Sequence, residues 1–222
     1  ATTKAVSMRN GISPRLADES RDQTLARLGI PAGRMLIGVV AVLDPRKGHL
    51  VLLEALLHIK RMNRDQSIPF IIIEGRGEMK LAITVFIAAH DLGKDVLLIG
   101  SERNIFNLMN SVDAICLPSV SHEDFPNVVL EAMSLGKPVI ASRLAGIPEQ
   151  IEHMKSGVLV ECGDSSGLAE AMVLLASDPA LRQRIGDDAR RRFAESFDAR
   201  TAVSGYVSLY RELIGMNERK PD

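Results

Sequence analysis

The chain has 222 residues, of which 46% are hydrophobic and 25% are charged. Its 27 basic and 28 acidic side chains give a net charge near −1, which excludes the broad basic surface of a nucleic-acid-binding protein. The longest apolar runs are far shorter than the roughly 20 residues that cross a bilayer. Cys116 and Cys162 lack metal-ligand spacing, and two isolated thiols predict a reducing, cytoplasmic compartment.

Strands and helices are predicted to alternate along most of the chain. Runs rich in Val, Ile and Leu predict buried strands at residues 35–43, 70–74, 95–99, 113–117, 138–142 and 157–160. Helical periodicity separates them at residues 50–61, 79–91, 104–110, 126–135 and 148–153, and continues alone at residues 165–176, 179–196 and 200–215. This order predicts an α/β fold with a three-layer, Rossmann-like, doubly wound parallel sheet, to which the first thirty residues are loosely attached.

The loops that leave the strands are the expected place for a ligand. In doubly wound folds ligands bind beyond the carboxyl ends of the strands, where helix N-termini present free N–H groups. The loops at these ends span residues 44–48, 75–78, 100–103, 118–127 and 143–149.

The segment S-H-E-D-F-P-N-V-V-L-E-A-M-S-L-G at residues 121–136 contains two acids, Glu123 and Glu131, with seven residues between them. A helix begins near Pro126, and on its wheel only Asn127, Glu131 and Ser134 are polar. One interpretation is a solvent-facing stripe on a mostly buried helix. The other is a carboxylate directed at the hydroxyls of a ligand, with helix N–H groups beneath an anion.

Three further loops contain glycines. D-P-R-K-G at residues 44–48 suits a phosphate, because a glycine permits close backbone approach and Lys47 supplies charge; a solvated polar turn is the alternative. G-R-G-E at residues 75–78 fails as a dinucleotide-binding motif, since Lys80 stands where the third glycine belongs, and predicts a tight turn. A-G-I-P-E at residues 145–149 also predicts a structural turn.

Taken in order, these segments resemble glycosyltransferase family 4. The resemblance extends from about Asn10 to the end of the chain. It rests on N-G-I at residues 10–12, L-D-P-R-K-G at 43–48, E-G-R-G-E at 74–78, P-S-V-S-H-E-D-F-P-N-V-V-L-E-A-M at 118–133, G-K-P-V-I-A-S at 136–142 and A-G-I-P-E at 145–149. Members of this family are retaining, nucleotide-sugar-dependent enzymes of the GT-B fold, in which two Rossmann-like domains face each other across the active site.

The resemblance implies a role for each matching residue. Glu123 is expected to contact hydroxyls of the donor sugar, and Lys47 to neutralise the diphosphate; these two are the candidate catalytic residues. Glu131 is expected to bind the ribose hydroxyls. The other candidate donor-binding residues are Asp124, Phe125, Pro126 and Asn127, whose backbone would hold the sugar and the diphosphate, and Ile99 and Gly100, which would frame the nucleobase.

The sequence departs from the family pattern at Val42. Family members place an arginine five residues before the lysine, and Val42 occupies that position here. Arg46, on the adjacent turn, is the candidate to supply the missing charge. Charge-assisted hydrogen bonds contribute roughly 1.5–3 kcal/mol, so the loss of one predicts donor binding or activity weaker by roughly 10- to 100-fold.

The chain matches only the C-terminal, donor-binding half of the GT-B fold. Residues 1–30 are therefore interpreted as the interdomain linker and first helix, and residues 31–222 as the nucleotide-sugar-binding domain. The acceptor-binding domain is expected to lie outside this chain. The last helix, with Tyr206 and Tyr210, resembles the family's closing helix, which often packs back on that domain.

The resemblance predicts transfer of a sugar from a UDP- or GDP-sugar to a glycan or lipid-linked acceptor, in bacterial surface polysaccharide or glycolipid synthesis. The chain by itself is expected to bind the donor without transferring it, and no metal or other cofactor is expected. Two alternatives stay open: a nucleotide-sugar-binding module without catalysis, and a retaining glycosidase that uses Glu123 and Glu131.

A basic run at residues 190–192 follows two aspartates on a predicted late helix. Such a run predicts ion pairs between neighbouring turns. The alternative is contact with anionic lipid, which would place a cytoplasmic protein at the membrane periphery.

Overall fold

The computed structural model describes residue 6 and residues 8–31, 33–62 and 68–217. Its centre is a six-stranded parallel sheet with the order β3-β2-β1-β4-β5-β6. The strands are β1 (Leu36–Val40), β2 (Phe70–Glu74), β3 (Val96–Ile99), β4 (Ala114–Leu117), β5 (Val139–Ser142) and β6 (Val158–Val160). Each predicted strand is present, although β1 ends at Val40, three residues earlier than predicted.

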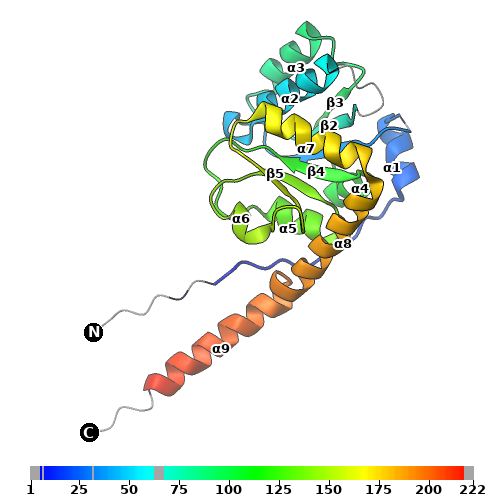
Figure 1. Cartoon of the computed structure of the whole chain (residues 1–222). Coiled ribbons are helices and arrows are strands. Elements are labelled where there is room, and N and C mark those ends of the chain that lie inside the picture. Colours follow the sequence, from blue (N-terminus) through cyan, green and yellow to red (C-terminus); the bar gives the residue numbers. More distant parts are fainter. Residues whose placement is uncertain (1–5, 7, 32, 63–67, 218–222) are drawn as a thin grey trace.

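Helices cover both faces of the sheet (Figure 1). One face carries α2 (His49–Arg61), α3 (Lys80–Ala89) and α7 (Ser165–Ser177). The other carries α4 (Ile105–Ser111), α5 (Asn127–Ser134) and α8 (Pro179–Ser196), with α1 (Arg21–Leu28) beside α4 and the short α6 (Ile147–Gln150) beside α5. The predicted three-layer, doubly wound α/β fold is confirmed.

Alternate strand residues point into two separate cores. In β2, Ile71 and Ile73 join the apolar cluster under α2 and α7, whereas Phe70 and Ile72 join the cluster under α4, α5 and α8. Because both faces are buried, both sets of side chains are apolar, which explains the continuous apolar runs in the sequence.

The strand order reverses between β1 and β4. These strands are neighbours, with Ile37 paired to Ala114, but the chain continues from β1 to one side of the sheet and from β4 to the other. The loops that follow them therefore diverge, which forms the crevice where doubly wound folds bind ligands. The loop after β1 contains a 3-10 turn, η1 (Pro45–Lys47).

Helix α1 and the residues just before it make specific polar contacts with the domain, which the expectation of a loosely attached segment did not include. Ser20 caps α1 in a reciprocal arrangement with Gln23. Arg21 forms an ion pair with Asp113 beside β4, with N and O 3.1 Å apart. The side-chain oxygen of Asn107 on α4 accepts hydrogen bonds from the backbone just before α1. Long-range polar contacts of this kind are invisible to local sequence patterns.

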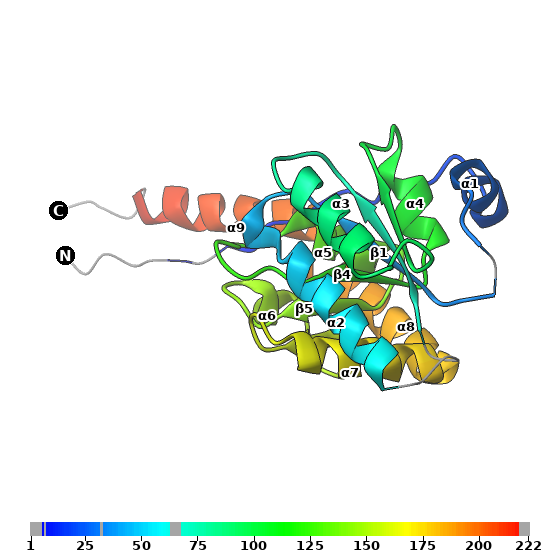
Figure 2. The ribbon, with the colours of Figure 1, turned by 90° about the horizontal axis from the view of Figure 1, so that it is seen from above.

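Helix α9 (Ala199–Asn217) extends away from the body of the domain, alongside the segment at residues 8–12 (Figures 1 and 2). The two meet where Ile12 donates to the carbonyl of Phe197 at 3.0 Å and accepts from the amide of Ala199 at 3.0 Å. Large apolar side chains of α9 are exposed: Val203, Tyr206, Val207, Tyr210, Leu213 and Ile214. Within the described ranges, no helix is both long enough and apolar enough to span a membrane.

Candidate functional site

The turn after β1 is shaped by its own charged residues. The carboxylate of Asp44 caps η1 by accepting from the amide of Arg46 at 2.9 Å. It also accepts from the guanidinium Nε and Nη2 of Arg46 at 2.9 and 3.0 Å. The Arg46 guanidinium lowers the pKa of Asp44 to about 2. The charge of Arg46 is therefore already matched within the turn, which weakens its expected role as substitute for the missing arginine.

Gly48 ends this turn because no other residue type fits. Its φ is +67°, and a Cβ added there would lie 1.9 Å from the carbonyl oxygen of Pro118. The amide of Val120 donates to the carbonyl of Arg46 at 2.7 Å, which joins the same two loops a second time. The loops after β1 and β4 are thus in direct backbone contact on either side of the switch point.

This contact brings together the two candidate catalytic residues. The ammonium of Lys47 donates to Oε1 of Glu123, and the hydroxyl of Ser119 donates to the same oxygen at 2.7 Å. The Glu123 side chain is 6% exposed and that of Lys47 is 22% exposed. A carboxylate so deeply buried needs a partner of opposite charge, which Lys47 supplies. Lys47 follows β1 and Glu123 follows β4, and these strands are neighbours only in the folded sheet.

The loop between β4 and the start of α5 has an unusual backbone. His122 adopts φ of +52° and Ala145, on the loop after β5, adopts +47°. The two loops are joined where Gly146 donates to the carbonyl of Asp124 at 2.9 Å. A Cβ at Gly146 would lie 2.2 Å from that oxygen. Left-handed conformations in residues other than glycine persist where surrounding contacts enforce them, and they are frequent at functional sites.

The remaining candidates of this loop have different surroundings. Asp124 and Phe125 line a pocket of about 390 Å³ together with residues 8–10, 145, 146 and 149. Phe125 also meets Phe197 edge to face, with ring centroids 5.8 Å apart. Pro126 has no N–H, and its carbonyl accepts from the side chain of Gln150 at 3.1 Å. The backbone of Pro126 thus has no donor with which to hold a phosphate.

Helix α5 carries the second acid of the pair. Val129, Leu130, Ala132 and Met133 are buried, as the helical wheel predicted. Asn127 is exposed, and its side chain accepts from Asn10 at 3.1 Å. Burial raises the pKa of Glu131, whereas the positive charge of Arg15 lowers it.

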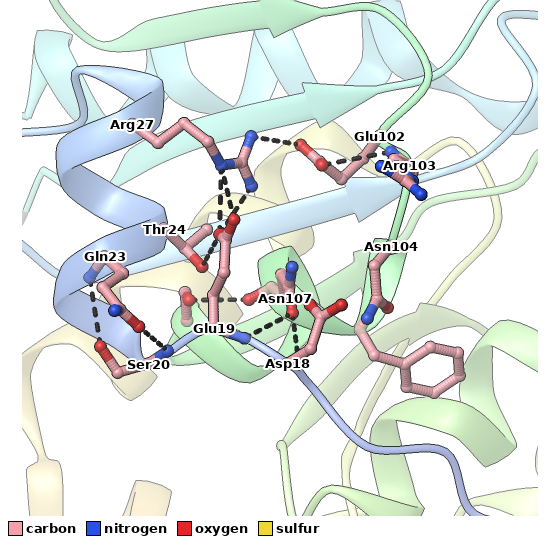
Figure 3. A network of polar contacts seen from close by, with 12 residues as sticks. Asp18, Glu19, Ser20, Gln23, Thr24, Arg27, Glu102, Arg103, Asn104 and Asn107 are labelled. Atoms are coloured by element: carbon pink, nitrogen blue, oxygen red, sulfur yellow. Dashed lines mark hydrogen bonds and ion pairs between the residues drawn. The ribbon is translucent and has the colours of Figure 1, made fainter.

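The loop after β3 is fixed by a buried acid. Ile99 pairs with Glu74 at the end of the sheet, and the Glu74 carboxylate accepts from the amide of Glu102 at 2.9 Å. Burial raises the pKa of Glu74. Figure 3 shows that Arg27 on α1 then joins Glu102 to Glu19, with contacts of 3.1 Å and 2.9–3.1 Å.

A groove of about 720 Å³ lies beside this network. Its lining includes residues 102–107 of the loop and of α4, but not Ile99 and Gly100, which come just before them. Its charged walls are Arg15, Asp18, Glu19, Arg27, Glu102 and Arg103. Arg15, on the wall of this groove, also lowers the pKa of Glu131, the carboxylate that the resemblance assigns to the ribose.

The glycines of G-R-G-E allow two loops to meet. Gly75 and Gly77 have φ of +150° and +156°. A Cβ at these positions would lie 1.9 Å from the carbonyl of Ala41 and 2.3 Å from that of Leu43. The predicted tight turn is present, and the need for glycine comes from the neighbouring loop after β1.

Val42 lies in that loop and is 62% exposed. Arg46 is held by Asp44 and Lys47 by Glu123. The turn thus places no unmatched cation at positions 42, 46 or 47.

The basic run on α8 has protein partners. Arg191 pairs with Asp188 one turn earlier, as local spacing predicted. Arg190 donates to the carbonyl of Leu135 at 2.9 Å. Arg192 donates to the carbonyls of residues 149 and 150 at 2.8 Å. Contact with anionic lipid stays a prediction, but these interactions account for the run within the protein.

Sequence analysis assigned no role to Ser119 or Asn10, although both lie in segments that carry the family resemblance. The contact of Ser119 with Glu123 could have been found, because a polar residue directly after a buried strand lies at the ligand-binding edge. The contact of Asn10 with Asn127 could not, because the two residues lie 117 positions apart. Among the described residues, no group of three or more His, Cys, Asp or Glu side chains is placed to hold a metal ion.

The sheet order, the contact between loops at the switch point and helix α5 give the chain the fold of the C-terminal domains of GT-B glycosyltransferases. The family model described as "Glycosyl transferases group 1" matches residues 20–192, and the chain belongs to this family.

Individual relatives agree with this assignment. The D-inositol 3-phosphate glycosyltransferase of Corynebacterium jeikeium is 30% identical over 204 residues, which cover 89% of this chain and 48% of the relative. HepE of Anabaena in complex with UDP-glucose has a TM-score of 0.81 at 25% identity, covering 92% of this chain and 57% of that one. The C-terminal domain of the group 1 glycosyl transferase LpcC from Francisella tularensis has a TM-score of 0.70 at 24% identity, covering 84% and 95%. The chain spans between about a third and a half of the curated relatives it matches.

Proposed function

We propose that this chain is the donor-binding half of a retaining glycosyltransferase that uses a nucleoside-diphosphate sugar. The observation that carries the proposal is the junction of Lys47 and Glu123 at the switch point, beside the N-terminus of α5. UDP is the first candidate carrier, because HepE of Anabaena forms a complex with UDP-glucose. GDP is the second.

In the proposed site, each charged group has a separate task. Lys47 and the N–H groups at the start of α5 face the diphosphate, since cations and helix N-termini favour anions. Glu123 accepts hydrogen bonds from the sugar hydroxyls. Glu131, half-buried on α5, accepts from the ribose hydroxyls, and the nucleobase enters the groove beside residues 102–107.

Transfer breaks the bond between the anomeric carbon and the diphosphate oxygen and forms a bond to an acceptor hydroxyl oxygen. The acceptor proton leaves with the diphosphate, and the transition state resembles an oxocarbenium ion, as in glycoside hydrolysis. Negative charge grows on the departing phosphate, where Lys47 and the α5 N-terminus are preorganised to stabilise it. Retention follows from attack on the face that the diphosphate leaves, without a protein nucleophile.

The acceptor and the setting belong to the whole protein. We propose a glycan or lipid-linked acceptor, bound by an N-terminal domain that meets the exposed apolar side chains of α9, and a role in bacterial surface polysaccharide or glycolipid synthesis. One observation favours a second candidate, a donor-binding module without catalysis: Val42 is apolar and Arg46 is already paired with Asp44.

Calorimetry and thermal unfolding of this chain with UDP, GDP and ADP test the donor site. A ligand at 100 times its dissociation constant stabilises a protein by about 2.7 kcal/mol. We expect one nucleotide to stabilise the chain, Glu131→Ala to abolish the effect, and Glu170→Ala, an exposed acid on α7, to preserve it. Absence of binding by all three nucleotides would contradict the proposal.

Activity of the full-length protein separates the two candidate functions. Lys47→Ala is expected to lower turnover by about 10²–10³-fold, the usual effect of removing one preorganised donor. Donor binding without transfer or donor hydrolysis in the wild-type protein would favour the non-catalytic module. Hydrolysis of aryl glycosides without nucleotide would instead indicate a glycosidase.

A further inference from the structure

One oxygen of Glu123 is shared between two donors. Lys47 and Ser119 both donate to Oε1, and Ser119 is completely buried. Within the described part of the chain, Oε2 accepts no hydrogen bond, and it is not sealed from solvent. The carboxylate is therefore anchored through one oxygen and leaves the other accessible.

This contact reduces the positive charge that Lys47 can offer to a diphosphate. An ammonium that faces a diphosphate acts as a point charge, and a carboxylate held against it neutralises that charge. The turn offers no unmatched cation to compensate, because Asp44 holds Arg46 through two hydrogen bonds and position 42 is a valine. A diphosphate that approaches Lys47 therefore also approaches the negative charge of Glu123.

We propose that Glu123 competes with the diphosphate for Lys47, and that Ser119 is the positioning residue that makes this competition selective for the intact donor. The inference rests on the proposed function. Free nucleoside diphosphate has no sugar hydroxyls to offset its repulsion by the Glu123 carboxylate. A nucleotide sugar brings hydroxyl groups that donate to Oε2, which Ser119 holds in place through Oε1.

The arrangement has a consequence for turnover. Once the sugar has been transferred, its hydroxyls no longer accompany the diphosphate, and the repulsion between the diphosphate and Glu123 is no longer offset. The same contact that discriminates between ligands therefore favours release of the nucleoside diphosphate product. Lys47 is placed to neutralise charge in the transition state, and Glu123 limits how firmly that charge holds the product.

The test is calorimetric titration of the folded chain with UDP and UDP-glucose, and in parallel with GDP and GDP-mannose. The wild-type chain is compared with Glu123→Gln, which keeps the shape and removes the charge, and with Ser119→Ala. Ser156→Ala is the matched control: Ser156 is equally buried, and its hydroxyl accepts from the amide of Glu152 at 2.9 Å, far along the chain from the switch point.

We expect Glu123→Gln to bind the free diphosphate about tenfold tighter than the wild type, since a charge-assisted contact with Lys47 is released for the ligand. It should also lose the preference for the nucleotide sugar. Ser119→Ala should leave the diphosphate affinity within about threefold and weaken the nucleotide sugar about tenfold. Ser156→Ala should change neither ratio, even where it lowers thermal stability, which separates positioning from a general loss of structure.

Unchanged or weaker diphosphate binding by Glu123→Gln overturns the inference and leaves the proposed function intact, because the donor still binds. If Glu123→Gln fails to fold, Ser119→Ala decides: an unaltered ratio of the two affinities overturns the inference. Absence of binding by every variant to every nucleotide overturns both proposals together.

Discussion

His49, the first residue of α2, gives the folded chain a specific sensitivity to acid. Its side chain is buried, and neither ring nitrogen makes a well-formed hydrogen bond among the described residues, although the backbone of Asp44 partly offsets the effect of burial on its pKa. Burial lowers the pKa of His49 to about 4, against the ordinary value of 6.5. The residue directly follows Gly48, so its environment is that of the loop contact at the switch point.

The direction of the effect follows from proton binding. Between pH 6.5 and 4 the unfolded chain protonates His49 and the folded chain does not, so the free energy of unfolding falls as the pH falls through this range. One pKa unit corresponds to 1.36 kcal/mol. The difference between 6.5 and about 4 therefore predicts that about 3 kcal/mol of stability, present above pH 6.5, is lost by pH 4.

Urea unfolding at pH 7, 6, 5 and 4 measures this loss, with His49→Leu as the variant and His90→Leu, an exposed histidine, as the control. At pH 7 we expect His49→Leu to differ from the wild type by less than about 1.5 kcal/mol, because leucine fills a similar buried volume and no well-formed hydrogen bond is lost. Its stability should fall with acid by about 3 kcal/mol less than that of the wild type. Parallel curves for the wild type and His49→Leu would refute the reasoning.

Three further predictions use matched pairs of positions. Val42→Arg places a cation at an exposed position of the turn and should tighten UDP or GDP binding about three- to tenfold in calorimetry. Val85→Arg, at an exposed position on α3, should have no effect. Equal effects of the two substitutions would show that net charge alone is responsible. Gly48→Ala and Gly29→Ala both place alanine at positive φ, at a cost of about 1 kcal/mol, but only Gly48→Ala adds a contact of 1.9 Å with the carbonyl oxygen of Pro118. Chemical unfolding should therefore show an additional loss of stability of about 1–3 kcal/mol for Gly48→Ala. Similar losses of stability in the two variants would contradict the loop contact. Arg27→Met and Glu102→Gln should show a coupling energy of about 0.5–1 kcal/mol in a double-mutant cycle of unfolding, because the Glu102 side chain is only 10% exposed. Additive effects would mean that the ion pair between Arg27 and Glu102, drawn in Figure 3, contributes nothing to stability.

Much of the fold could be predicted because its signals are local. Each strand is a short apolar run buried on both faces, and each crossover helix shows its own periodicity, so their alternation alone requires parallel strands. The polar stripe on α5 could be predicted in the same way, since helical geometry fixes which side chains share a face. Even the turns at Gly48 and Gly146 were visible as glycines between elements.

What the sequence by itself determined was therefore the set of elements, their order in the chain, and the residue types available at each strand end. Only the tertiary structure decided which of these residues meet. Lys47 and Glu123 lie 76 residues apart, and they pair because β1 and β4 are adjacent in the sheet. Helix α1 and the residues just before it are likewise tied to the domain through Asn107 and Asp113, far along the chain. The physical reason is that charges and hydrogen bonds depend on distances in space, which the strand order sets and local patterns do not contain.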